Sequence, residues 1–217
     1  LARELKSCIH IPVITGGVIK SPELADRIIR ENQADFVFLG RSLLADSDWA
    51  AKARQGRETE IRPCIMCNNC IAGNFKGLTV SCTVNPSTGR ETQFNYYIDR
   101  SVNNKQQVLI AGSGPAGLEA ALSLDRQGFE VILYEKDEKL GGLLNLAAVP
   151  PYKERVRLLR DYLIRQIEQS RVQVQLNQPF SPDILDKENV DYVIIATGSK
   201  PIAPAVRGWN SSFCPGL

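Results

Sequence analysis

The chain lacks several features that would indicate a charged binding surface or a membrane segment. Its 217 residues carry a formal net charge of only +2 and include a single histidine and a single methionine. The nearly balanced charge gives no electrostatic reason to expect nucleic acid or a membrane surface as a partner. No apolar run approaches the length of a membrane span, and no internal repeat or low-complexity stretch is visible. The composition predicts an ordinary globular protein of one or two domains.

Familiar hydrolytic machinery is also missing. The sequence contains no Ser/His/Asp constellation and no paired carboxylates, and its one histidine, His10, directly precedes an expected strand. We interpret His10 as structural and assign no catalytic residue. The single methionine, Met66, lies inside a cysteine-rich loop, and the first residue is Leu1, so we expect the chain to be a piece of a longer protein.

Cysteine is the residue type whose placement is most informative. Four of the six cysteines follow the spacing C-x2-C-x2-C-x11-C, at Cys64, Cys67, Cys70 and Cys82. Three thiolates from one tight loop and a fourth from nearby chain suit an iron–sulfur cluster. Structural zinc sites more often use two separated C-x2-C pairs or Cys/His mixtures, so zinc is one alternative, and free or disulfide-bonded cysteines are another.

The cysteine count also bears on the cellular compartment. Clustered cysteines favour a reducing environment over a secreted disulfide scaffold, which predicts a cytoplasmic location. Cys8 and Cys214 lie outside the motif, and we assign no function to either.

The first 60 residues alternate strand and helix. We predict buried strands at 11–15 and 34–39, each followed by glycine, and helices after Ser21-Pro22 and after 46–48. The predicted inner faces of the two helices consist of Leu24, Ala25, Ile28 and Ile29, and of Trp49, Ala50 and Ala53.

The glycines after these two strands suggest an anion site. Loops after the last two strands of a TIM barrel commonly bind phosphate, and Gly16, Gly17, Gly40 and Arg41 occupy such loops. From spacing alone the alternative is equally good: the glycines form tight turns and Arg41 is solvated. The fold class is α/β, and the N-terminus supplies two of the eight βα units of a full TIM barrel.

The second half has the pattern of a dinucleotide fold. A strand at 107–111 leads into Gly112-x-Gly114-x-x-Gly117 and a helix, and a second strand at 130–134 ends at Glu135. Gly112 permits the turn, Gly114 lets the backbone approach a pyrophosphate, and Gly117 allows close helix–strand packing. Glu135 follows Gly112 by 23 residues and can accept from ribose hydroxyls. The alternative is a Rossmann-like fold without a nucleotide.

Further motifs in this half resemble the two-dinucleotide flavoproteins. Gly141-Gly142 follows the acid, and Ala196-Thr-Gly198 ends a strand at 191–195. The resemblance implies FAD in this domain, with ADP as the alternative. The implied FAD residues are Gly112, Gly114, Ala116, Gly117, Glu135, Gly142 and Leu143. Between these motifs we predict a half-exposed strand at 172–176 and a helix at 151–168, with Leu158, Leu159, Tyr162, Leu163 and Ile167 facing inward.

Residues 11–49 resemble the end of the old yellow enzyme barrel, and the cysteine loop resembles that of its larger iron–sulfur relatives, the NADH:flavin oxidoreductases. The segments that carry this resemblance are I-P-V-I-T-G-G, D-F-V-F-L-G-R-S-L-L-A-D, R-P-C-I-M-C-N-N-C and C-T-V-N-P-S-T-G-R-E. The family implies FMN, with its phosphate on Gly16, Gly17, Gly40 and Arg41, and a [4Fe–4S] cluster on the four motif cysteines. The two-residue gap between the second and third cysteines is more similar to trimethylamine dehydrogenases than to many dienoyl-CoA reductases.

Taken together, the motifs predict three regions of an iron–sulfur flavoprotein oxidoreductase. These are the C-terminal part of an FMN-binding TIM barrel (1–60), a [4Fe–4S] loop with linker (61–105), and an incomplete Rossmann-like FAD/NAD(P)-binding domain (106–217). The resemblance implies that electrons pass from NAD(P)H through FAD and the cluster to FMN.

The implied substrate is a small molecule, an enoyl or dienoyl thioester or a similar enone, whose C=C bond is reduced. Alternatives are an amine dehydrogenase of the trimethylamine type, a stand-alone electron-transfer module and a zinc-stabilised binding protein. We expect the 217-residue chain alone to be inactive as an alkene reductase, and its two barrel strands to expose edges and apolar faces.

Overall fold

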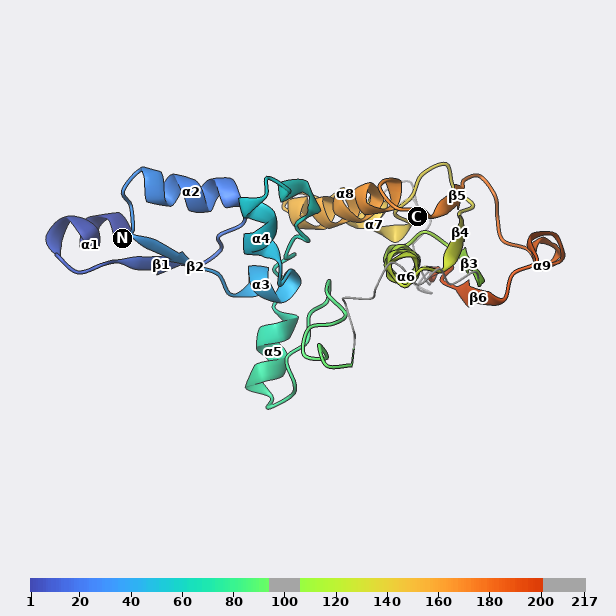
Figure 1. Ribbon diagram of the computed structural model, residues 1–217, viewed down its shortest axis with the longest axis horizontal. Coiled ribbons are helices and arrows are strands. Elements are labelled where there is room, and N and C mark those ends of the chain that lie inside the picture. Colours follow the sequence, from blue (N-terminus) through green and yellow to red (C-terminus); the bar gives the residue numbers. More distant parts are fainter. Residues whose placement is uncertain (94–105, 201–217) are drawn as a thin grey trace, which may run out of the picture.

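A computed structural model describes residues 1–93 and 106–200. Figure 1 shows an elongated arrangement, with a small α/β segment at one end, a larger α/β domain at the other and the cysteine loop between them. The N-terminal and loop elements are α1 (Ala2–Cys8), β1 (Ile14–Gly16), α2 (Pro22–Arg30), β2 (Phe36–Phe38), α3 (Arg41–Ala45), α4 (Trp49–Arg54), the 3-10 helix η1 (Glu58–Glu60) and α5 (Asn69–Phe75). The remaining elements are β3 (Gln107–Ala111), α6 (Pro115–Arg126), β4 (Glu130–Tyr134), α7 (Leu143–Ala147), α8 (Glu154–Glu168), β5 (Gln173–Gln175), α9 (Asp183–Glu188) and β6 (Tyr192–Ile195).

The N-terminal segment is a βαβ unit. Strands β1 and β2 pair in parallel, with Ile14 opposite Phe36. Helix α2 begins where the sequence predicts, because the Ser21 hydroxyl accepts from the Leu24 N–H at 3.3 Å and Pro22 occupies the first turn. The crossover through α2 thus joins two parallel strands, and the described residues supply this sheet with no others.

The prediction that these two strands are buried is wrong. Ile14, Phe36 and Phe38 are 62, 56 and 58% exposed. In a complete barrel each strand is flanked by two others, and its side chains pack into the barrel interior or against the outer helices. The described residues supply this sheet with two strands only. The expectation of exposed apolar faces in this segment is thereby confirmed. On α4, Trp49 is buried as predicted, but Ala50 is exposed.

The larger sheet is parallel in the order β5-β4-β3-β6. Strands β5, β4 and β3 have the 3-2-1 order of one mononucleotide-binding half of a Rossmann fold, and β6 takes the place of the fourth strand. Strands β3 and β4 pair along their full length, from Gln107 opposite Glu130 to Ala111 opposite Tyr134. The predicted strands and the helix that follows the glycine motif are confirmed, and β5 is partly exposed as the alternation predicts.

Two layers of helices and loops enclose this sheet. One face packs against α6 and α8, where the predicted inward residues Leu159, Tyr162, Leu163 and Ile167 are buried. Leu158 is an exception: it is 51% exposed, because it lies on the face of α8 that is turned towards the N-terminal segment and lines a cavity there. The opposite face packs Leu109 and Ile132 against Ile184 and Leu185 of α9.

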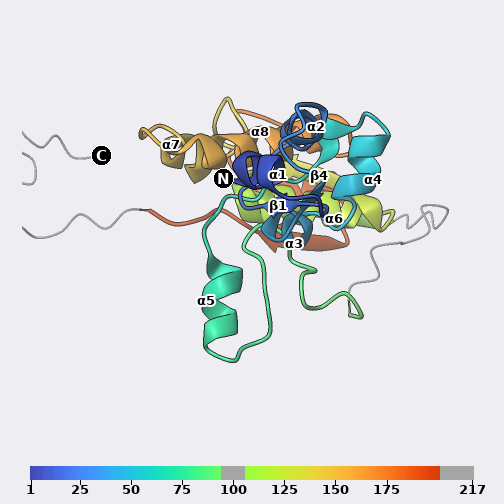
Figure 2. The same cartoon turned by 90° about the vertical axis from the view of Figure 1, so that its left-hand side faces the viewer.

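The cysteine loop contains a short helix, α5, that the sequence motifs do not predict. In Figure 2, α5 extends away from both sheets. After the loop, the chain returns to the N-terminal segment, where the Asn85 amide and the Thr88 hydroxyl both donate to the Leu44 carbonyl, at 3.0 and 2.7 Å. Within residues 1–93 and 106–200, no helix combines the length and apolar character needed to cross a bilayer.

Candidate functional site

The glycine motif forms a tight loop at the carboxyl end of β3. Gly112 has φ +103°, and a Cβ there would lie 2.5 Å from the Ala196 carbonyl oxygen. A Cβ on Gly117 would overlap the Gly112 carbonyl, whereas a Cβ on Gly114 would meet nothing within 4 Å. Packing of the protein therefore requires Gly112 and Gly117. At Gly114 the space is open, as expected where a pyrophosphate approaches the backbone at the start of α6.

Glu135 is buried beside this loop, at 5% exposure. One of its carboxylate oxygens accepts from the Ser113 N–H at 2.8 Å and from the Ser113 hydroxyl at 2.5 Å; the other accepts from the Asp137 N–H at 3.0 Å. Burial raises the pKa of Glu135, but these hydrogen bonds outweigh burial, so its net pKa is lowered. The carboxylate is thus held ionised, and the oxygen that accepts only from the Asp137 N–H keeps a lone pair for a ribose hydroxyl.

The second glycine pair packs directly on the first loop. Gly142 has φ +51°, and a Cβ there would lie 2.9 Å from the Gly114 Cα. The Gly141 N–H donates to the Ser113 carbonyl at 3.0 Å. The other two predicted FAD residues, Ala116 and Leu143, are exposed in the first turns of α6 and α7. The structure therefore brings the predicted FAD residues together around the loop that follows β3.

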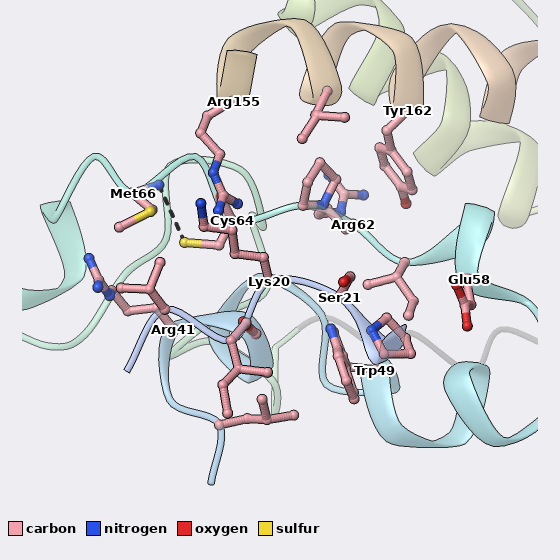
Figure 3. Close-up of a pocket in the computed structure, with 18 of the residues that line it drawn as sticks. Lys20, Ser21, Arg41, Trp49, Glu58, Arg62, Cys64, Met66, Arg155 and Tyr162 are labelled. Carbon is pink, nitrogen blue, oxygen red and sulfur yellow. Dashed lines mark hydrogen bonds between the residues drawn. The ribbon is translucent and has the colours of Figure 1, made fainter. Parts of the chain in front are cut away.

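A cavity of about 470 Å³ lies between the N-terminal segment and α8 (Figure 3). Three of the four predicted phosphate residues, Gly17, Gly40 and Arg41, line it. A Cβ on Gly17 or Gly40 would meet no atom within 4 Å, so both backbones are open to a ligand. Gly16 is different, because the Phe38 ring lies over it, and a Cβ there would have to displace this ring, which is 58% exposed. Gly16 does not line the cavity.

Basic side chains from both halves of the chain reach this cavity. Lys20 lies after β1, and Arg155 projects from α8 towards Cys64 (Figure 3). The Arg155 Nη1 donates to the Cys64 carbonyl at 3.2 Å, whereas its Nη2 is buried without a hydrogen-bond partner among the described residues. A buried guanidinium N–H without an acceptor is costly, so this atom suits an anionic or polar ligand group. The sequence motifs did not identify Arg155, because it lies 85 residues beyond Cys70.

The four motif cysteines line one small cavity together with Arg41. The loop turns sharply between them, since Met66 and Asn68 have φ of +57° and +59°. The Met66 N–H donates to the Cys64 sulfur at 3.4 Å, and the Cys67 thiol donates to the Thr83 hydroxyl at 3.2 Å. All four sulfur-bearing side chains thus converge from a single folded loop.

Four thiols are ligands for either an iron–sulfur cluster or a zinc ion, and the C-x2-C-x2-C spacing favours the cluster. Within residues 1–93 and 106–200, no group of three or more His, Cys, Asp or Glu side chains is arranged to hold a metal ion. Burial raises the pKa of the Cys82 thiol, and the nearby Cys64 and Cys67 raise it further, despite hydrogen bonds from backbone N–H groups. A bound metal would reverse this by stabilising the thiolate.

A direct contact joins the predicted phosphate site to the cysteine loop. The Arg41 Nη1 donates to the Asn68 side-chain carbonyl. Arg41 also lines both cavities, the one beside Gly17 and Gly40 and the one between the cysteines. Sequence reasoning assigned Arg41 to phosphate alone, because a contact across 27 residues leaves no trace in local spacing.

Two protein families match this chain. Residues 106–216 match "Pyridine nucleotide-disulphide oxidoreductase", which covers just over half of the chain, and residues 2–60 match "NADH:flavin oxidoreductase / NADH oxidase family". The chain belongs to the NADH:flavin oxidoreductases that carry a pyridine nucleotide-disulphide oxidoreductase domain. The family resemblance read from the motifs is confirmed.

Individual relatives match nearly all of the chain. The NADH oxidase of Thermoanaerobacter brockii is 44% identical over 210 residues, which are 96% of this chain and 32% of that protein. The structure of 2-naphthoyl-CoA reductase in complex with 2-naphthoyl-CoA has a TM-score of 0.87 at 28% identity, covering 98% of this chain and 32% of its own. The 6-hydroxypseudooxynicotine amine oxidase of Pseudomonas geniculata N1 also has a TM-score of 0.87, at 30% identity, covering 94% and 31%.

The chain thus spans about a third of the length of these relatives. The NADH:flavin oxidoreductase family binds FMN, and the pyridine nucleotide-disulphide oxidoreductase domain binds FAD and NAD(P)H. The flavins and the nicotinamide nucleotide predicted from the sequence are therefore confirmed at the level of the family.

Proposed function

We propose that the whole protein containing this chain transfers electrons from NAD(P)H through FAD and a [4Fe–4S] cluster to FMN, and that it reduces the C=C bond of a small enoyl or dienoyl thioester or a similar enone. Residues 1–60 would contribute the end of the FMN barrel, 61–105 the cluster loop and linker, and 106–217 the FAD/NAD(P) domain. Residues 94–105 and 201–217 lie outside the described part. We also propose a cytoplasmic location.

The observation that carries this proposal is the position of the cysteine loop between the two predicted flavin sites. Asn68 of the loop accepts from Arg41 at the predicted FMN phosphate site. On the other side, the Cys64 carbonyl accepts from Arg155 of α8, in the dinucleotide domain. The loop that would hold the cluster therefore contacts both predicted flavin regions directly.

When bound, the flavins would supply hydride chemistry and the cluster one-electron transfer. The chain's own residues would hold these groups. The Gly114 and Gly142 backbones would face the FAD pyrophosphate, and Glu135 the ribose. Gly17, Gly40 and Arg41 would face the FMN phosphate, whereas Gly16, the last residue of β1, lies under the Phe38 ring and outside the cavity. Cys64, Cys67, Cys70 and Cys82 would ligate the cluster.

A second candidate function is amine oxidation at FMN with the reverse electron flow. Two observations favour it: the two-residue gap between Cys67 and Cys70, and the amine oxidase whose structure matches as well as that of the CoA-thioester reductase. A stand-alone electron-transfer module is less well supported, because the βαβ unit at 14–38 matches a flavin barrel that a carrier does not need.

Substrate turnover by the whole protein separates these functions. Under anaerobic conditions, we expect a 2,4-dienoyl-CoA to oxidise NADH or NADPH in the presence of the enzyme, and dimethylamine to leave the flavin oxidised. Flavin reduction by the amine, with no turnover of the thioester, would contradict the reductase proposal and support the amine dehydrogenase. The 217-residue chain alone should turn over neither substrate, because its described residues supply only two barrel strands.

A further inference from the structure

Arg62 makes the most extensive set of buried polar contacts along the cysteine loop. Its side chain is only 6% exposed and lies two residues before Cys64. Its Nη1 donates to the Val84 carbonyl at 2.5 Å and to Glu119 at 2.7 Å, and its Nη2 donates to the other Glu119 oxygen at 3.0 Å. The guanidinium also lies over the Tyr162 ring, 5.3 Å from its centroid (Figure 3).

These contacts join both ends of the cysteine loop. Arg62 precedes the first motif cysteine by two residues, and Val84 follows the last, Cys82, by two residues. The Arg62 N–H is also fixed, because it donates to the buried Asp46 carboxylate at 2.8 Å, which is itself paired with Lys52 at 2.7 Å. One guanidinium therefore closes the base of the loop, and the backbone beside it is fixed to the N-terminal segment.

The third partner connects the loop to the dinucleotide site. Glu119 lies in the second turn of α6, the helix that begins after Gly114. The two parallel N–H···O bonds from Arg62 fix the angle as well as the distance between loop and helix. Lysine cannot reproduce this arrangement, because an ammonium offers no planar fork. Removing the Arg62 charge would leave the Glu119 carboxylate, which is 20% exposed, without this guanidinium. Removing the Glu119 charge would leave the buried Arg62 with the Val84 carbonyl and the Tyr162 ring but without a carboxylate from α6.

We propose that Arg62 is a positioning residue: it closes the cysteine loop and locks it onto α6, so that the cluster keeps one fixed place relative to the dinucleotide site. This inference rests on the proposed function, because the cluster is part of that function. The contacts of Arg62 themselves are made by the polypeptide and do not require a cluster. They involve side chains of all three regions of the chain.

Hydrogen exchange on the full 217-residue chain, free of cluster, tests the lock. We expect Arg62→Gln to raise the exchange rates of the amides at 62, 64–66 and 82–85 by about 100-fold, the effect of losing one partner of a largely buried pair. Arg62→Lys should give only partial protection. The control is Arg171→Gln, since Arg171 pairs with Asp125 on the same helix at 2.9 Å but does not touch the loop.

A second measurement uses Glu119→Gln, which keeps the side-chain volume and one acceptor. It tests the same contact from the other side, so the proposal can still be judged if the Arg62 variants misfold. It should raise loop exchange less than Arg62→Gln does. Exchange at 62, 64–66 and 82–85 within twofold of the unchanged chain in both variants would overturn the proposal.

The cluster-loaded chain supplies a readout that a general loss of stability would not give. Arg62→Gln removes a positive charge near the cluster and should lower its reduction potential, whereas Glu119→Gln removes a negative charge and should raise it. Shifts in the same direction would contradict the assigned geometry. If the unchanged chain binds no iron or sulfide but its loop is protected from exchange, the proposed function fails and the lock stands.

Discussion

The two parallel sheets of this protein differ in how much of their surface the chain encloses. In the four-stranded sheet, Leu109 and Leu133 are fully buried. In the two-stranded sheet, more than half of the surface of Phe36 and of Phe38 is exposed. Both sheets arise from the same pattern, a short apolar strand followed by glycine and a helix.

The difference shows that an apolar run specifies a strand but not its burial. The four-stranded sheet is covered by α6 and α8 on one face and by α9 on the other. The β1–β2 pair has α2 on one side, and the described residues provide no further strands beside it. Burial depends on how many neighbouring units are present, which is a property of the whole domain.

The largest expected effect contrasts the cores of the two sheets. Leu133→Ala should lower the free energy of unfolding by about 2–5 kcal/mol, because it opens a cavity in a closely packed core. Phe36→Ala, in an exposed strand, should change it by about 0.5 kcal/mol or less. Urea denaturation of both variants measures this. Equal losses would mean that the β1–β2 sheet is as well covered in solution as the four-stranded sheet, and would contradict the difference in burial.

The next prediction separates folding from binding within the glycine loop. Gly117→Ala should destabilise the dinucleotide domain by about 1–3 kcal/mol, since its Cβ would overlap the Gly112 carbonyl. Gly114→Ala should leave the melting temperature nearly unchanged, because its Cβ meets no protein atom, and should weaken FAD binding instead. Thermal melts and FAD titration of each variant provide the check. Unchanged FAD affinity in Gly114→Ala would refute the assigned pyrophosphate position.

Sequence patterns predicted most of the second half because its determinants are local. The strands at 107–111 and 130–134, the helix after the glycine motif and the apolar face of α8 all follow from spacing within a few residues. The prediction for Leu158 was wrong because the periodicity of α8 does not reveal that this face lines the cavity beside the N-terminal segment. The Arg41–Asn68 and Arg62–Glu119 contacts join residues 27 and 57 positions apart, beyond the reach of any local pattern.

A smaller effect is expected at the end of β4. Burial and a hydrogen bond to Glu188, 2.6 Å long, raise the pKa of Tyr134 from its usual 10 to about 12. The phenol is therefore favoured in the folded state: the resulting stability is complete below pH 10 and is lost as the pH rises from 10 to about 12. Tyr134→Phe should cost about 0.5–1.5 kcal/mol at neutral pH.

The same variant should remove the corresponding part of the alkaline loss of stability. Chemical denaturation at pH 7 and at closely spaced values above pH 9 would show this. A parallel decline in both proteins across that range would mean that Tyr134 does not carry the alkaline dependence.

The smallest expected effect lies on the exposed segment. Arg30 and Asp26 form an i,i+4 pair on α2 at 2.6 Å, with both side chains more than 60% exposed. Asp26→Ala should lower stability by about 0.3–0.5 kcal/mol, and less at high salt, because water and ions screen such a pair. A loss above 1 kcal/mol in denaturation experiments would show that α2 is packed more tightly than its exposure indicates.

We expect Cys64, Cys67, Cys70 and Cys82 to hold an iron–sulfur cluster between the two flavin regions. An anaerobic count of iron, acid-labile sulfide and flavin per chain is the decisive experiment. We expect about four irons with matching sulfide, together with FAD. Zinc without sulfide or flavin would contradict it and remove the redox function.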